Sequence, residues 1–184
     1  TLNREMRGDE PPTFKEMFRN LSKTFDGAYN IAFINAAGDL VVMRDPLGIK
    51  PMCYGEKDGL LVVASESVVL TNLDMAYKML EPGELIVANQ EGWKVERYAP
   101  KQRSAYCFFE WIYFANLGSS MEGRSVYKVR HSVGRELAKM ELAQGEPLAD
   151  MVVGVPETAK TVANSFGYHM GLPVMDGLLR NRYV

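Results

Sequence analysis

The sequence predicts an α+β fold in its first half and an α/β fold in its second half. Over residues 28–98, short apolar runs separated by turns containing Gly or Asp are typical of antiparallel hairpins. Residues 150–155 instead form a continuous apolar run, which is typical of a parallel strand buried on both faces. A helical pattern and a second apolar run follow it, as expected for a strand–helix–strand unit.

A dense aromatic stretch, residues 107–116, separates the two halves. Its apolar side chains recur at the spacing of one helical face, and no breaker occurs before Gly118. We predict a short apolar helix here, which is either an ordinary core helix or the joint between two domains at residues 1–103 and 104–184. The apolar positions on the predicted face are Phe108, Trp111, Ile112 and Ala115.

The composition is that of a globular protein. With 47% hydrophobic and 24% charged residues, the 184-residue chain can bury a sizeable core. A net charge of -2 predicts no general affinity for nucleic acid or an anionic membrane. No apolar run is long enough to cross a bilayer, no signal peptide is visible, and two cysteines make no disulfide framework. We therefore expect a cytoplasmic protein.

The first element in chain order is a helix that begins after Thr13. Glu16 follows Thr13 at the spacing of a capping box, and apolar residues then recur at helical spacing to about Phe25. Residues 28–34 and 40–43 are two apolar runs that predict a hairpin.

A tight turn follows the hairpin. Asp45-Pro46 initiates it, and Gly48 can supply a positive φ. The other strands of this half are predicted at residues 52–54, 60–64, 85–88 and 93–98, with a short helix after Ser67.

In the second half, Ser125 begins a helix that ends near Gly145. The turn at residues 156–159 leads from the buried strand into another helix through Met170, and Val174-Met175 then leads to a second strand around residues 177–179. The apolar positions along the first of these helices are Val129, Val133, Leu137 and Met140.

Four motifs of the first half occur in an order that resembles a known domain. Together they are similar to the later part of a class II glutaminase domain, in which an N-terminal nucleophile attacks glutamine. Several enzyme families share the turn at residues 44–51, so it indicates the domain and not the acceptor of ammonia. The motifs are Asp26-Gly27-Ala28-Tyr29, Arg44-Asp45-Pro46-Leu47-Gly48-Ile49-Lys50-Pro51, Ala64-Ser65-Glu66-Ser67 and Glu81-Pro82-Gly83-Glu84.

Residues 107–116 and 177–184 make the resemblance more specific, because both are similar to segments of the amidophosphoribosyltransferase family. The second half is then expected to be the start of a type I phosphoribosyltransferase domain. The resemblance implies an internal fragment, without the family's N-terminal Cys or its downstream phosphoribosyl loop, that is inactive alone. The alternative of Thr1 as a processed N-terminal nucleophile is less favoured, because polar residues without strand alternation follow it.

The resemblance implies glutamine-dependent amination of 5-phosphoribosyl pyrophosphate, the first committed step of purine biosynthesis. The substrates would be glutamine and 5-phosphoribosyl pyrophosphate, and the products 5-phosphoribosylamine, glutamate and pyrophosphate. Mg²⁺ would assist the departure of pyrophosphate, and some family members also hold a [4Fe–4S] cluster. Family members are homo-oligomers, so a dimer or tetramer is expected.

The resemblance also implies roles for individual residues. Arg44 and Asp45 would either shape the glutaminase turn or contact glutamine. Tyr113 would either couple the two active sites or pack in the core. Cys107 stands where the cluster-containing members have one of four thiolate ligands, whereas Cys53 is expected to be a small core residue.

The turn after the buried strand carries the predicted ligand residues of the second half. Glu157 and Thr158 follow the carboxyl end of a strand and precede a helix, which is a typical ligand position in α/β folds. Arg180, where the family usually has Lys, would approach the pyrophosphate. Ala159 replaces a Ser that assists Mg²⁺ in the family, and Asn116 replaces an Arg.

Two alternatives stay open. Another class II glutaminase enzyme would have a sugar-isomerase or ATP-pyrophosphatase domain after the first half, and the second half resembles neither. A non-catalytic scaffold protein would keep the fold but lose catalytic groups, as the replacements at Ala159 and Asn116 allow.

Overall fold

The computed structural model describes residues 12–101, 103–145, 149–181 and 183, so Thr1 lies outside the described residues. The chain divides into two compact units, Thr1–Cys107 and Phe108–Val184. The division falls four residues after the domain boundary expected at residue 103.

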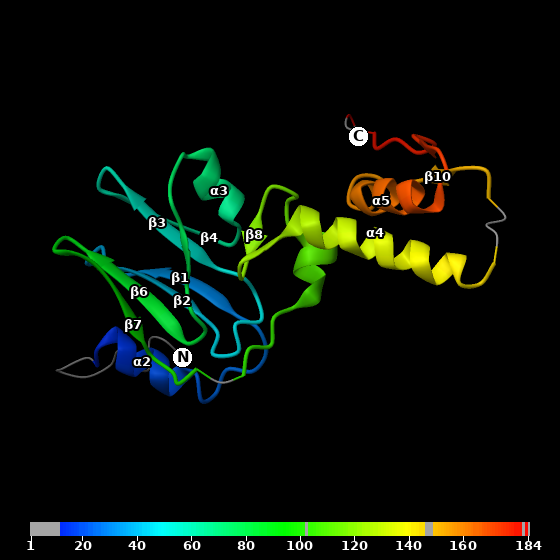
Figure 1. Ribbon diagram of the computed structural model, residues 1–184. Helices are drawn as coiled ribbons and strands as arrows, with labels where there is room; N and C mark the ends of the chain where they lie inside the picture. Colours follow the sequence, from blue (N-terminus) through cyan, green and yellow to red (C-terminus); the bar gives the residue numbers. More distant parts are fainter. Residues whose placement is uncertain (1–11, 102, 146–148, 182, 184) are drawn as a thin grey trace. The chain divides into compact units, whose positions relative to one another are not determined.

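The first unit contains a four-stranded antiparallel sheet in the order β1-β2-β6-β7. Its first two strands are the predicted hairpin, in which Ala32 lies opposite Val42. Alternating side chains of β2 and β6 pack on one face against the helix α2 (Phe14–Leu21) and on the other face against a second sheet, described below, so both faces of these strands are covered. Figure 1 shows the strands, which are β1 (Asn30–Ile34), β2 (Leu40–Arg44), β6 (Glu84–Asn89) and β7 (Gly92–Arg97).

A three-stranded sheet in the order β4-β3-β5 and a short helix complete the first unit. Two strands and the helix α3 (Ser67–Asn72) were predicted, whereas the two-residue strand β5 (Lys78–Met79) was missed because it is too short for a periodic pattern. The two predicted strands are β3 (Cys53–Lys57) and β4 (Leu60–Ala64).

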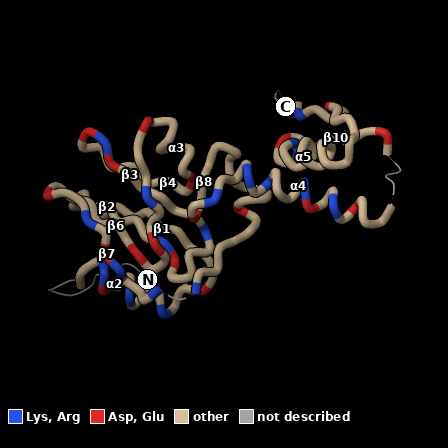
Figure 2. The backbone as a smooth tube through the Cα atoms, viewed as in Figure 1, with Lys and Arg blue, Asp and Glu red and all other residues tan. Residues whose placement is uncertain are grey.

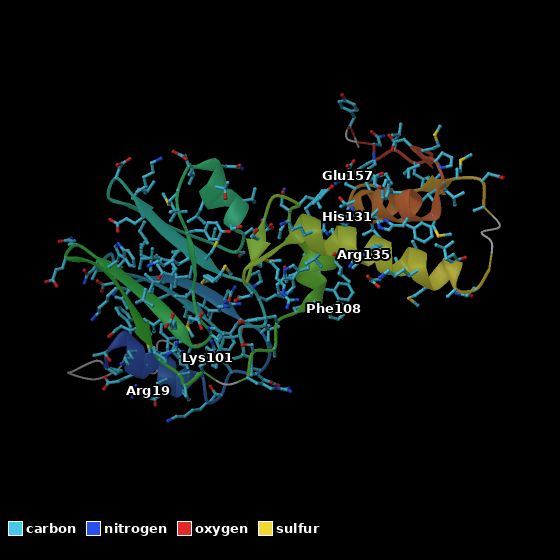
Figure 3. All side chains as sticks on the ribbon, in the orientation of Figure 1. Arg19, Lys101, Phe108, His131, Arg135 and Glu157 are labelled. Carbon is cyan, nitrogen blue, oxygen red and sulfur yellow. The ribbon has the colours of Figure 1, made fainter. Side chains whose placement is uncertain are left out.

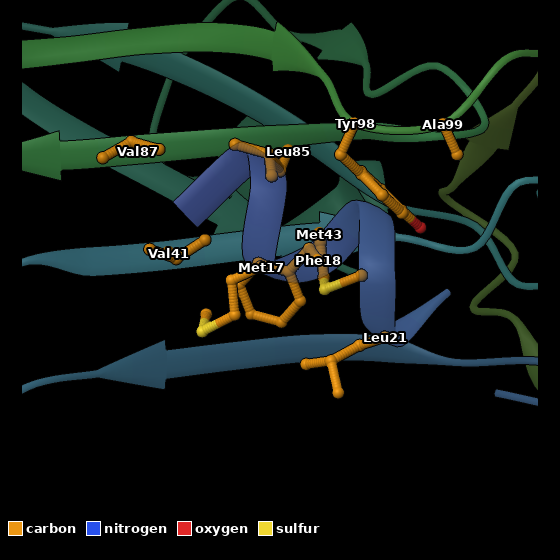
Figure 4. Packing of buried hydrophobic residues seen from close by; sticks show 9 residues of the cluster. All are labelled: Met17, Phe18, Leu21, Val41, Met43, Leu85, Val87, Tyr98 and Ala99. Carbon is orange, nitrogen blue, oxygen red and sulfur yellow. The ribbon is translucent and has the colours of Figure 1, made fainter. Parts of the chain in front are cut away.

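Helix α2 (Phe14–Leu21) confirms the predicted capping box, because the Thr13 hydroxyl accepts from the Glu16 N–H and the Glu16 carboxylate accepts from the Thr13 N–H. The helix ends at Leu21, short of the expected Phe25. Met17 and Phe18 are buried against the sheet, as Figure 4 shows. The other buried members of this core are Leu21, Val41, Met43, Leu85, Val87, Tyr98 and Ala99.

The second unit begins with a π-helix, η1 (Glu110–Phe114), where the sequence predicted an α-helical face. Ala115 donates to the carbonyl of Glu110 at 2.9 Å, five residues back, so the side chains do not follow the α-helical period. The predicted face is wrong in part, because Phe108 is 64% exposed, whereas Glu110 is only 8% exposed.

The short hairpin of β8 (Ser120–Met121) and β9 (Arg124–Ser125) leads into α4 (Val126–Leu142), which Ser125 caps as predicted. The buried side of α4 differs from its most apolar side. An added Cβ at Gly134 would collide with the carbonyl oxygen of Val162, so this glycine allows α4 to approach the next helix, α5 (Lys160–Met170), closely. The buried residues of α4 are Val126, Arg130, Gly134 and Ala138.

The predicted strand–helix–strand unit is confirmed, but its strands are shorter than expected. The second strand was predicted at residues 177–179 and lies instead at residues 174–175, directly after the turn that ends the helix. Strands β10 (Val152–Val153) and β11 (Val174–Met175) are parallel, and α5 (Lys160–Met170) connects them. Gly171 ends α5 with a φ of 70°, the left-handed conformation that glycine adopts without strain. Among the described helices, none is long and apolar enough to cross a membrane.

Candidate functional site

The first candidate site is the turn after β2, which is organised by a buried arginine. Arg44 is 1% exposed, and its guanidinium lies over the Tyr106 ring, 5.7 Å from the ring centroid. Three of its N–H groups donate to backbone carbonyls, those of Lys50 (2.9 Å), Leu80 (2.7 Å) and Gly48 (3.0 Å). One side chain therefore ties both arms of the turn to the segment before β6.

Asp45 holds the same turn from the other side. Its carboxylate accepts from the N–H groups of Leu47 at 2.9 Å and Ile49 at 3.0 Å, and its carbonyl accepts from the N–H of Gly48. Gly48 has a φ of 62°, and an added Cβ there would lie 2.6 Å from a Pro82 side-chain atom. The predicted need for glycine at this position is confirmed.

A buried tyrosine completes this arrangement. Tyr98 donates from its hydroxyl to the carbonyl of Arg44 at 2.7 Å, and burial raises the pKa of its phenol far above the usual range. Sequence analysis did not identify Tyr98, because nothing local in the sequence links it to the turn. The donors and acceptors described for Arg44 and Asp45 go to backbone groups, which favours a turn-shaping role. Contact of these residues with glutamine stays a prediction.

Cys53 is not a nucleophile at neutral pH in this structure. It lies in strand β3 with no exposed surface, and burial raises the pKa of its thiol to about 11. Since the thiolate is the reactive form, the thiol is inert near pH 7. This agrees with the expected core role.

Cys107 is the last residue of the first unit, and Tyr113 lies near the start of the second unit. Tyr113 is 59% exposed and makes edge-to-face ring contacts with Phe109 and Phe114. Cys107 is half-buried and donates its N–H to the carbonyl of Ile49 at 3.0 Å. Within the described ranges, no group of three or more His, Cys, Asp or Glu side chains is placed to hold a metal ion. The coupling role and the cluster role stay predictions.

The second candidate site lies at the carboxyl ends of β10 and β11. Glu157 is exposed and Thr158 is half-buried, and both lie in the turn between β10 and α5 (Figure 3 labels Glu157). No side chain caps the N-terminus of α5 at Ala159, and no acidic residue lies in its first turn. The positive end of the helix dipole is therefore not neutralised by its own first turn, which favours an anion.

An ion pair that sequence analysis missed lies at the same edge. Lys160, the first residue of α5, contacts Asp176, the residue after β11, with 3.0 Å between Nζ and Oδ1. The two side chains line a hollow of about 260 Å³, together with Gly154 and Asn164. The predicted topology could have indicated this pair. In a parallel strand–helix–strand unit, the first residue of the helix and the residue after the second strand lie at the same edge of the sheet.

Arg180 is exposed in the segment that follows β11. The structure places it in the same unit as Glu157 and Thr158, and it belongs to no helix or strand. Ala159, at the N-cap of α5, offers no side-chain oxygen to a metal ion. Approach of Arg180 to a pyrophosphate stays a prediction.

Comparison with known proteins gives matches to both units. Residues 10–72 match the family model described as a glutamine amidotransferase domain. The amidophosphoribosyltransferase of Pyrococcus horikoshii is 36% identical over 92% of this chain, and that of Bacillus subtilis is 32% identical over 94%. The chain spans only 37% and 35% of the lengths of these two relatives.

Two solved structures extend the similarity to the fold. The glutamine phosphoribosylpyrophosphate amidotransferase of B. subtilis, complexed with ADP and GMP, matches 99% of this chain with a TM-score of 0.84 and 30% identity. A structure titled the allosteric regulatory enzyme of purine biosynthesis matches the whole chain with a TM-score of 0.86 and 31% identity. The chain covers 39% and 38% of those proteins.

Proposed function

We propose, from the homology of this chain to amidophosphoribosyltransferases, that it is part of an enzyme of that kind. The reaction would convert glutamine, water and 5-phosphoribosyl pyrophosphate into 5-phosphoribosylamine, glutamate and pyrophosphate, the first step of purine biosynthesis. The observation that carries the proposal is the similarity across both units, at 36% identity over 92% of the chain. A glutaminase match alone would leave the acceptor of ammonia open.

The first unit would contribute a rigid part of the glutaminase domain. The Arg44 guanidinium and the Asp45 carboxylate hold the turn through backbone groups, so the turn presents the same surface in each cycle of the reaction. Such preorganisation limits the reorganisation needed when glutamine binds. In this role neither residue transfers a proton or forms a covalent bond.

The second unit would bind the diphosphate of 5-phosphoribosyl pyrophosphate. The uncapped N-terminus of α5 directs backbone N–H groups toward the turn that holds Glu157 and Thr158. These donors suit phosphate oxygens, and the Thr158 hydroxyl can add another. Arg180 would supply positive charge from the segment after β11.

Two side chains in the turn before α5 offer oxygen atoms that suit Mg²⁺. Mg²⁺ typically takes one or two protein oxygens together with water and substrate phosphates, and Glu157 and Thr158 offer such oxygens. The ion would neutralise charge on the leaving pyrophosphate. A [4Fe–4S] cluster requires four thiolates, of which Cys107 would be one, and no step is assigned to Cys107 through a cluster.

The cellular setting is part of the proposal. The protein would be a cytoplasmic homo-oligomer, either a dimer or a tetramer. It would bind glutamine and 5-phosphoribosyl pyrophosphate, and it would bind neither nucleic acid nor a membrane. Figure 2 shows basic and acidic residues interspersed in both units, which supports the absence of a nucleic-acid partner.

The test is glutamine hydrolysis by the full-length gene product, measured with and without 5-phosphoribosyl pyrophosphate. We expect glutamate release that this ligand stimulates, with pyrophosphate formed in equal amount. Glutamate release that ignores the ligand would instead indicate another class II glutaminase enzyme. Absence of turnover under both conditions would favour the scaffold alternative.

A further inference from the structure

The Lys160–Asp176 ion pair lies where a diphosphate would bind. Lys160 is the first residue of α5, directly after the ligand turn, and Asp176 directly follows the neighbouring parallel strand. Their side chains are 34% and 68% exposed, so both are accessible from the hollow that they line.

We propose that Lys160 binds the diphosphate of the substrate and that Asp176 holds this lysine while the site is empty. The inference rests on the proposed function and adds a specificity-determining residue to it. Binding would exchange one anionic partner of the ammonium group for another, and Asp176 would be released from the pair.

The exchange is electrostatically favourable. An exposed ion pair contributes little net stability, because water and salt screen both charges. A diphosphate carries several negative charges and also receives backbone N–H donors from the start of α5, so it competes well with one carboxylate. Asp176 disfavours the ligand twice, because it occupies the lysine and repels the incoming anion.

The pair also has a simpler reading, in which it only ties the start of α5 to the end of β11. The two interpretations differ in how removal of the Asp176 carboxylate would change anion binding. A purely structural pair predicts equal loss of stability from either partner and no gain in binding. The exchange predicts that loss of Lys160 weakens anion binding, whereas loss of Asp176 strengthens it.

The experiment is calorimetric titration of inorganic pyrophosphate with Mg²⁺ into the full-length gene product. We expect Lys160→Gln to weaken binding about tenfold and Lys160→Arg to retain most of it. Asp176→Asn should strengthen binding by about threefold, and the double variant should resemble Lys160→Gln. Lys139→Gln is the matched control, because Lys139 pairs with Glu136 on α4 at 3.1 Å.

Thermal melting of each variant separates loss of fold from loss of binding. Equal pyrophosphate affinity in wild type, Lys160→Gln and Asp176→Asn would overturn the exchange while leaving the proposed function standing. Weakened binding in Asp176→Asn would also overturn it. Absence of pyrophosphate binding by the folded full-length wild-type protein would overturn both the exchange and the proposed function.

Discussion

At the scale of single residues, two buried side chains hold the geometry of the turn after β2. The guanidinium of Arg44 and the carboxylate of Asp45 are each 1% exposed, and backbone groups satisfy them. A buried charge without such partners is costly, so the turn and its two charged residues must form together. This coupling makes Gly48, between them and Pro82, sensitive to substitution.

We expect Gly48→Ala to destabilise the first unit by about 2–4 kcal/mol, from left-handed backbone strain together with contact of the new Cβ with Pro82. Urea unfolding followed by circular dichroism measures this change. Gly38→Ala is the control, because Gly38 has a φ of 88° but open space around a Cβ. If the two variants lose equal stability, contact with Pro82 plays no part.

Cys53 gives a pH prediction. Burial raises the pKa of its thiol from 9.0 to about 11. The folded state therefore holds this proton more tightly than the unfolded chain does. The protonated thiol therefore contributes fully to the free energy of unfolding below pH 9, and this contribution is lost as the pH rises to 11. We expect Cys53→Ala to reduce the fall in unfolding free energy over that window, by up to about 1.4 kcal/mol per pH unit. Identical slopes in the two proteins would contradict this.

At the scale of elements, packing rather than apolar periodicity decides which face of α4 is buried. Arg130 donates to the carbonyls of Trp111 (2.7 Å) and Ala115 (2.8 Å), so a charged residue on the buried face holds the π-helix. Gly134 on the same face lets α5 approach. Residues of the apolar stripe, such as Met140 at 64% exposure, remain accessible.

Gly134→Ala tests this packing, because two effects of opposite sign compete. Alanine favours a helix over glycine by about 1 kcal/mol. The new Cβ would collide with the Val162 carbonyl oxygen and crowd Ser165, which costs about 1–3 kcal/mol or more in a packed helix pair. We expect net destabilisation of the second unit in thermal unfolding. Glu141→Ala, on the exposed side of α4, is the control, and a stabilised Gly134→Ala protein would refute the packing argument.

At the scale of the whole molecule, the second unit exposes many large apolar side chains, among them Leu137 and Met140 of α4. The apolar stripe of α4 lines a hollow of about 810 Å³, and β10 and β11 form a sheet of two short strands with exposed side chains. Exposed apolar surface and unpaired strand edges promote association.

We therefore predict that the 184-residue chain is poorly soluble and self-associates when it is expressed alone. Replacing Leu137 and Met140 together by Glu should reduce the associated fraction in sedimentation velocity, because both side chains are exposed on α4. Replacing Leu60, an exposed residue of the first unit, in the same way controls for added charge. A monodisperse wild-type chain that melts cooperatively would count against the prediction.

The sequence by itself determined the helices, most strands and the turns, because these depend on neighbours within a few residues. For that reason the sequence predicted the capping box of Thr13 and Glu16, the positive φ of Gly48 and the strand–helix–strand unit. Only the tertiary structure decided that Tyr98 bonds to Arg44, that α4 buries Arg130, that residues 110–114 form a π-helix, and that Lys160 meets Asp176. The three contacts join residues distant in sequence. The π-helix is local, but it forms where α4 packs against residues 110–114. Local periodicity carries no information on such pairings, since they follow from how whole elements pack.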